Sequence, residues 1–270
     1  MKKAAAICIA LALVIFGIWF IAFSDSLLIS LINGSFGKEN IDFQTEGFRK
    51  GAFYNFSAER IVLRRREIKG DSFTPLLEFR NVRGWLDFMS LFRMRPELDF
   101  VGEMSGGEVT GKVGLKGKEN LTIRGDTIHI KGIPFLDSLG IQGDGLLSGD
   151  FQMSNDTGEV KFSVADASLK SASWGGVVPL EMFHEIKGAA TIKDGAVEVR
   201  SLALSGKGVY GRVRGSIKGL NADMSFELMT DSSFGLGSLT HAVLGQYKVS
   251  PGYYVVPLKG KMVKTTEDQE

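Results

Sequence analysis

The pattern closest to a reactive motif is the segment Gly206-Lys207-Gly208-Val209-Tyr210-Gly211, which matches the G-x-G-x-x-G loop of dinucleotide-binding proteins. That loop works by opening a helix whose N-terminal amides hold a pyrophosphate. Here the residues that follow alternate between apolar and polar types, as they do in a strand. We therefore predict a turn between two strands at this position and no nucleotide site.

The other residue types that carry chemistry are scattered. His129, His184 and His241 lie far apart, and none belongs to an H-x-x-x-H or similar ligand spacing, so we predict surface or strand histidines. The sequence lacks G-x-S-x-G, H-E-x-x-H and P-loop motifs, and no spacing singles out a pair of carboxylates. We expect no catalytic residue, no metal and no cofactor, and we predict that the protein is not an enzyme.

Charge and cysteine content exclude further classes. The 32 basic and 31 acidic residues give a formal net charge of +1, which provides no case for a nucleic-acid partner. The only cysteine is Cys8, so an intrachain disulfide and a thiolate metal cluster are excluded. The densest basic run is Arg64-Arg65-Arg66. It contacts anionic lipid headgroups in one interpretation and lies on a charged solvent-exposed strand in the other, which we favour.

Hydrophobic periodicity of two dominates the chain from about residue 34 onward and predicts a mainly β fold. In the clearest stretch, apolar residues share one face of successive strands and polar residues the other, which is typical of an antiparallel meander. The residues expected on this apolar face are Val209, Val213, Ile217, Met224, Phe226 and Leu228. The face is either ordinary core or the lining of an apolar groove, and we favour core.

Turns and short helices punctuate this pattern. Asp194-Gly195 is a strong hairpin signal, and the phase of alternation then slips by one residue, which predicts a bulge at Arg200-Ser201. Short helices are expected over residues 86–92, 134–139 and 238–247.

The N-terminal segment is an uninterrupted apolar run over residues 4–23, long enough to span a bilayer as a helix. Lys2 and Lys3 precede it and no basic residue follows until Lys38, so we predict a cytoplasmic N-terminus and an exported body. A cleavable signal peptide ending near Ala22-Phe23-Ser24 is the alternative, although its apolar region is normally shorter. The residues expected to lie in the membrane include Ala4, Leu11, Val14, Phe16, Trp19, Phe20 and Phe23.

Three parts of the chain follow from these signals. A membrane-anchoring helix is expected over residues 1–33, because the apolar pattern continues to the stop signal Asn33-Gly34. One antiparallel β-sheet domain with a few short helices is expected over residues 34–263. Residues 264–270 are polar and are expected to form a tail.

Two groups of motifs carry a resemblance to known families. Phe183, Gly188, Asp194-Gly195 and the glycine-rich strand from Gly208 to Ile217 resemble the repeat of the AsmA-like envelope proteins. The segment from Leu86 to Gly107 is similar to another of their recurring pieces. The whole layout, with Ile133-Pro134-Phe135-Leu136 and the segment Tyr254 to Gly260, most resembles the N proteins of type II secretion systems (GspN).

This resemblance implies an elongated, curved sheet and an accessory, non-catalytic role in a type II secretion system. The protein would be anchored in the inner membrane of a Gram-negative-type bacterium, with its bulk in the periplasm and other secretion components as partners. The AsmA-like relatives imply the alternative of an envelope protein that binds or transfers phospholipid. Neither family supplies catalytic residues.

Overall fold

The computed structural model describes residue 30 and residues 41–51, 54–66, 73–87, 89–90, 93, 97–114, 120–138, 141–154, 157–171, 180–194, 196–218, 221–231 and 244–261. The chain is mainly β, with one large antiparallel sheet and few helices, as predicted. Neighbouring strands follow in the order β1-β3-β4-β5-β6-β7-β8-β9-β10-β11-β12-β13-β15-β14, and β2 pairs with β3. The chain divides into two compact units, one comprising Met1–Gly102 and Lys112–Glu119, the other Glu103–Gly111 and Asn120–Glu270.

Unit 1 is built around the β3–β4 hairpin. The strands of unit 1 are β1 (Ile41–Glu46), β2 (Arg49–Lys50), β3 (Asn55–Arg66) and β4 (Phe73–Leu86). The next two strands, β5 (Glu97–Met104) and β6 (Gly107–Gly114), each contain residues of both units. Along β4 the buried residues are first Phe79 and then Val82 and Leu86, a change of phase at Asn81, which has a φ of 50°. A residue in the left-handed conformation shifts the alternation of the strand by one position. The apolar residues before and after it can therefore lie on the same face of the sheet.

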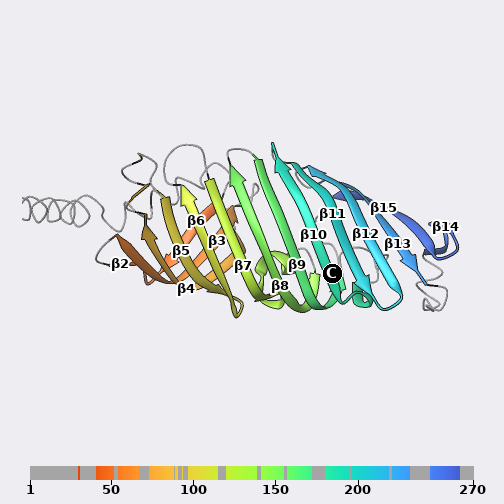
Figure 1. The fold of residues 1–270 in the computed structure, drawn as a ribbon, viewed down its shortest axis with the longest axis horizontal. Coiled ribbons are helices and arrows are strands. Elements are labelled where there is room, and N and C mark those ends of the chain that lie inside the picture. The colour runs from red at the N-terminus through yellow and green to blue at the C-terminus, as the bar shows by residue number, and fades with distance from the viewer. Residues whose placement is uncertain are drawn as a thin grey trace, which may run out of the picture. The chain divides into compact units, whose positions relative to one another are not determined.

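From β7 to β13, unit 2 is a meander in which each strand pairs with the next, and β15 then pairs with β13 on one side and β14 on the other. Figure 1 shows its strands side by side in chain order from β7 to β13. They are β7 (Asn120–His129), β8 (Ile141–Ser154), β9 (Thr157–Ser171), β10 (Glu185–Lys193), β11 (Ala196–Gly206), β12 (Val209–Lys218), β13 (Asn221–Thr230), β14 (Lys248–Ser250) and β15 (Tyr253–Lys261). The described helices are short: η2 (Ile130–Gly132), α4 (Pro134–Ser138) and η3 (Leu180–Met182).

Several local predictions are confirmed. Asp194 lies in the connection between β10 and β11, and the pairing of β11 with β12 skips Arg200 and Ser201, the predicted bulge. The G-x-G-x-x-G segment is a hairpin turn, because β11 ends at Gly206 and β12 begins at Val209. Gly208 has a φ of 72° there, a conformation that glycine adopts without steric cost.

The helix predictions have mixed outcomes. The turn predicted over 134–139 is confirmed as α4. The helix predicted over 86–92 is wrong at Leu86, which ends β4 with its side chain buried, although Met89 and Ser90 are helical. Sheet pairing and burial of Leu86 outweigh its helix propensity. Of the helix predicted over 238–247, only residues 244–247 are among the described residues, and Leu244 and Gly245 are helical.

Candidate functional site

The strands of unit 2 share one continuous apolar face. The pairing places residues directly opposite one another, so each set of paired residues forms a row across the sheet with side chains on the same face. We number four rows from the strand ends next to the β10–β11 turn. Row 1 contains Ile192, Val197, Ile217 and Ala222; row 2 contains Val160, Ala190, Val199, Met224 and Leu258; row 3 contains Phe162, Leu202, Val213, Phe226 and Val256; row 4 contains Val164, Ile186, Leu204, Leu228 and Tyr254.

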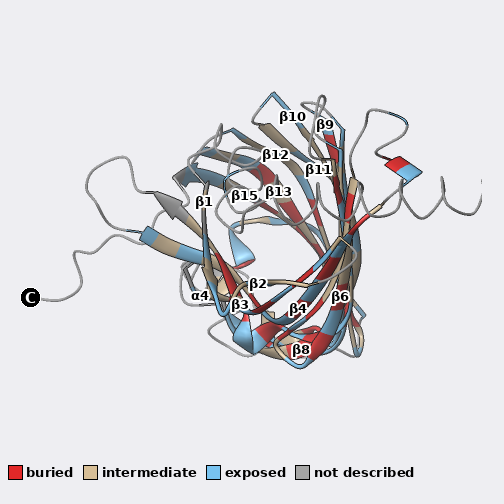
Figure 2. Ribbon diagram, turned by 90° about the vertical axis from the view of Figure 1, so that its left-hand side faces the viewer, coloured by how far each residue is buried: buried red, intermediate tan, exposed pale blue. Residues whose placement is uncertain are grey.

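Burial increases steadily from row 1 to row 4. All four listed members of row 1 are half-buried, whereas all five members of row 4 are buried. In row 2 only Met224 is buried, and in row 3 the buried members are Val213, Phe226 and Val256. Buried and exposed positions alternate along the strands (Figure 2), as they do along β12. We call rows 1 and 2 the open half of the apolar face and rows 3 and 4 the covered half.

The covered half is closed by a side chain that comes from outside the strands. Phe183 follows η3 and is completely buried, and its ring meets that of Phe226 edge to face at a centroid distance of 6.4 Å. Gly211 lies beneath the two rings, because a Cβ atom built there would be 2.9 Å from Phe226 and 3.1 Å from Phe183. The glycine is therefore required by the close approach of two aromatic rings.

The six residues expected on the apolar face do lie on it, at different depths. Val209, Val213, Met224, Phe226 and Leu228 are buried, with exposed fractions between 0% and 6%. Ile217 alone among them is half-buried, in row 1. The open half contains residues that sequence reasoning did not select, such as Val160, Ile192 and Val197.

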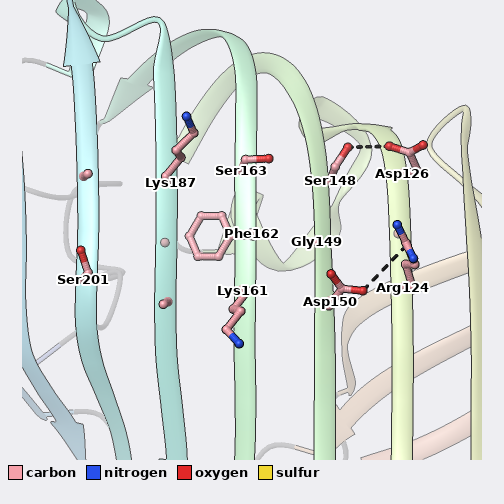
Figure 3. A pocket seen from close by; sticks show the side chains of 14 residues that line it. Arg124, Asp126, Ser148, Gly149, Asp150, Lys161, Phe162, Ser163, Lys187 and Ser201 are labelled. Atoms are coloured by element: carbon pink, nitrogen blue, oxygen red, sulfur yellow. Dashed lines mark hydrogen bonds and ion pairs between the residues drawn. The ribbon is translucent and has the colours of Figure 1, made fainter.

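The opposite face of unit 2 contains an open hollow of about 530 Å³ that crosses strands β7 to β11. Figure 3 shows its lining from close by. The charged side chains around it are those of Arg124, Asp126, Asp150, Lys161 and Lys187, and the small ones are those of Ser148, Ser163, Ala189, Ser201 and Ala203. The hollow exists because these small residues occupy polar-face positions that longer side chains usually fill.

The charges around this hollow are largely paired with one another or with neighbours. The Arg124 guanidinium Nε lies 3.8 Å from Asp150 Oδ1, and the Ser148 hydroxyl donates to Asp126 Oδ1 at 2.7 Å. Lys161 and Lys187 pair with Glu159 and Glu185, which lie outside the hollow. The hollow is therefore a polar recess with satisfied charges. The residues that line the hollow come from five strands, so no motif in the sequence marks them. The one trace in the sequence is that small residues occupy several polar-face positions.

In unit 1, Arg64 of the basic run belongs to a ladder of ion pairs. The Arg64 guanidinium pairs with Asp42, its register partner on β1, and lies 4.7 Å from the centre of the Phe73 ring. Arg60 faces Arg80 directly across β3 and β4. The side chains of Arg65 and Arg66 are outside the described part of the structure.

Glu78 relieves the repulsion between Arg60 and Arg80. It accepts hydrogen bonds of 2.9 Å from Arg60 Nη2 and from Arg80 Nε. The hydrogen bond from Arg60, reinforced by Arg80, lowers the pKa of the Glu78 carboxyl from its usual value. The ladder therefore ties β1, β3 and β4 together through charge.

The histidines in the described residues have ordinary surroundings. His129 Nδ1 lies 3.3 Å from Asp144 Oδ1, and His184 is exposed. The pKa of Asp144 is lowered mainly by the backbone N–H of Gly145 and then by His129. His241 falls outside the described ranges. Within those ranges, no three His, Cys, Asp or Glu side chains are grouped so that they could hold a metal ion.

The residues expected to anchor the protein in a membrane belong to the N-terminal segment. Ala4, Leu11, Val14, Phe16, Trp19, Phe20 and Phe23 all lie outside the described residues. In the part of the chain that is described, no helix has the length and apolar character needed to cross a bilayer.

Comparison with known proteins adds no relative. No family model, no curated protein and no solved structure matches this chain.

Proposed function

We propose that this chain is an accessory, non-catalytic component of a type II protein secretion system. Residues 1–33 anchor it in the inner membrane, and its β sheet lies in the periplasm. The proposal rests on the resemblance of its motifs to the GspN and AsmA-like families. It also rests on the role of those motif residues, which build the core and the turns of unit 2.

One observation carries the proposal. Phe183 and Gly211 are 28 residues apart in the sequence and belong to the resembling segments, and they meet in the covered half, where Gly211 makes room for Phe183 and Phe226. A motif of this kind specifies a rigid sheet and supplies no reactive group. A rigid body held at the membrane suits a protein that positions other proteins.

Deleting the gene tests this role. We expect the level of secreted enzymes in the medium to fall and to be restored by the full-length chain. A version in which a cleavable signal peptide replaces residues 1–33 should restore it poorly, because the body would then leave the membrane surface. Cross-linking in intact cells followed by mass spectrometry should identify secretion components. Normal secretion together with no cross-linked secretion component would refute the proposal.

The second candidate is an envelope protein that binds phospholipid, and the open half of the apolar face favours it. Row 2 crosses the strands from β9 to β15, and five intervals of about 4.8 Å give it a width of about 24 Å, which is comparable with an extended acyl chain. An acyl chain that covers half-buried apolar side chains lowers the free energy, because it removes their apolar surface from water.

Ile217 and Ser216 provide a matched pair of variants to test lipid binding. Ile217 is in row 1, and Ser216 is the exposed neighbour on the opposite face of β12. With the full-length protein purified from membranes, Ile217→Asp should abolish cross-linking to a photoreactive phospholipid, and Ser216→Asp should retain it. Equal cross-linking in both variants, or none in the unmodified protein, would exclude the open half as a lipid site.

A further inference from the structure

The last long strand of unit 2, β15, has a paired neighbour along only part of one side. On its inner side it pairs with β13 from Tyr253 to Lys261. On its outer side the short strand β14 pairs with Tyr253 and Tyr254 alone. Among the described residues, no strand pairs with the rest of β15 on that side. An edge of this kind presents backbone N–H and C=O groups to which a strand of another chain can bind.

The hydrogen bonds of β15 show which residues direct their backbone groups toward this outer edge. The Val255 N–H donates to the carbonyl of Tyr247, which precedes β14, and the Thr230 N–H at the end of β13 donates to the Gly252 carbonyl. Successive residues of an antiparallel strand direct their backbone groups to opposite sides. Odd-numbered residues of β15 therefore face the outer edge, and even-numbered residues face β13. The next odd-numbered residue after Val255 is Pro257, which has no N–H to donate.

The composition of β15 would otherwise favour the addition of a strand. The six residues from Tyr253 to Leu258 (Tyr-Tyr-Val-Val-Pro-Leu) include no charged residue and are rich in aromatic and β-branched types, which have high β-propensity. Pro257 interrupts this segment and is exposed. Lys259 is also exposed, and its ammonium group lies 3.2 Å from Oδ1 of the equally exposed Asp223. Proline and lysine are typical of strand edges that remain unpaired.

We propose that Pro257, supported by Lys259, closes the β15 edge to a second copy of this chain. Two copies related by a twofold axis would pair these edges antiparallel, so the residue on the axis would face its own counterpart. With Pro257 on the axis, two residues without N–H groups would meet. With Lys259 on the axis, two ammonium groups would meet and repel each other. Neither the membrane nor the role in secretion enters this prediction, because it concerns the strand alone.

The double variant Pro257→Thr/Lys259→Thr tests this prediction. Threonine is β-branched and restores one N–H group at the edge, and the second substitution removes the charge. A symmetric pair of copies then regains two hydrogen bonds, one from each copy. At about five-fold for each hydrogen bond, we expect dimer formation by the full-length protein in detergent micelles to strengthen about 25-fold. Analytical ultracentrifugation over a series of protein concentrations measures the dimer fraction.

The variant Pro75→Thr/Lys161→Thr is a matched control. It makes the same two substitutions on β4 and β9, which have neighbouring strands on both sides. Lys161 pairs with Glu159, as Lys259 pairs with Asp223, so the control also removes one exposed ion pair. Its dimer fraction should equal that of the unmodified protein.

Hydrogen exchange locates the new contact and checks the fold. In the double variant, peptides from β15 should become more protected as the protein concentration rises, and peptides from β13 should keep the protection they have in the unmodified protein. If β13 loses its protection, Pro257→Thr alone, which keeps the ion pair with Asp223, provides the same test and should dimerise to a smaller extent. A folded variant with an unchanged dimer fraction, a dimer that leaves exchange in β15 unchanged, or equal dimerisation of the control would overturn the proposal.

Discussion

The division of the apolar face into two halves predicts that equal truncations will have unequal costs. Phe226 in row 3 is completely buried, and Ile217 in row 1 is half-buried on the neighbouring strand. Replacing Phe226 with alanine removes a ring that packs against Phe183 and leaves a cavity, for which we expect a loss of about 3–5 kcal/mol. Ile217→Ala removes side-chain surface that is already partly hydrated, so we expect a loss of about 1 kcal/mol.

Hydrogen exchange of the full-length protein in detergent micelles measures these costs locally. The opening free energies of peptides from β12 and β13 can be compared between variants without assuming that the two units unfold together. Adding Phe183→Ala to Phe226→Ala completes a double-mutant cycle, and an edge-to-face pair should give a coupling of about 0.5–1.5 kcal/mol. If Ile217→Ala costs as much as Phe226→Ala, row 1 is covered as fully as row 3, and the open half does not exist in the folded protein.

Three further predictions concern single contacts. Gly211→Ala should destabilise unit 2 by about 1–3 kcal/mol, because the new methyl group meets the rings of Phe183 and Phe226. Gly245→Ala is the control and should be neutral or stabilising, because no atom lies within 4 Å of the added Cβ. Thermal unfolding of both variants measures the difference. Ser90→Ala should cost about 1–3 kcal/mol, since the buried Ser90 hydroxyl donates to the Asp87 carbonyl and accepts from the Glu97 N–H, and hydrogen exchange at the start of β5 should rise. Because the folded pKa of Glu78 is lowered from 4.5, its contribution to stability is present above that pH and is lost as the pH falls through the folded value. Exchange in β3 and β4 should therefore increase on acidification below about pH 4.5, and Glu78→Gln should weaken that pH dependence; an unchanged pH profile in this variant would count against the ion-pair ladder.

Local features were predictable because they depend on a few consecutive residues. The alternation of Val209, Val213 and Ile217 predicts one apolar face, since side chains on a strand point to opposite sides in turn. The Asp194-Gly195 turn and the bulge at Arg200-Ser201 followed from the same alternation and from turn chemistry. In the structure Asp194 lies between β10 and β11, and the pairing of β11 with β12 skips Arg200 and Ser201. Leu86 was misassigned to a helix because its short apolar segment suits both states, and pairing within β4 decides between them.

The sequence by itself determined which residues share a face of the sheet, and it excluded a disulfide and the common catalytic motifs. Only the tertiary structure decided how deeply each position lies. Ile217 and Val213 have the same type of side chain on the same face of β12, yet one is half-buried and the other is 2% exposed. The difference arises because Phe183, which comes from outside the strands, covers the half of the face that contains row 3, and burial by a distant residue leaves no mark in the local pattern.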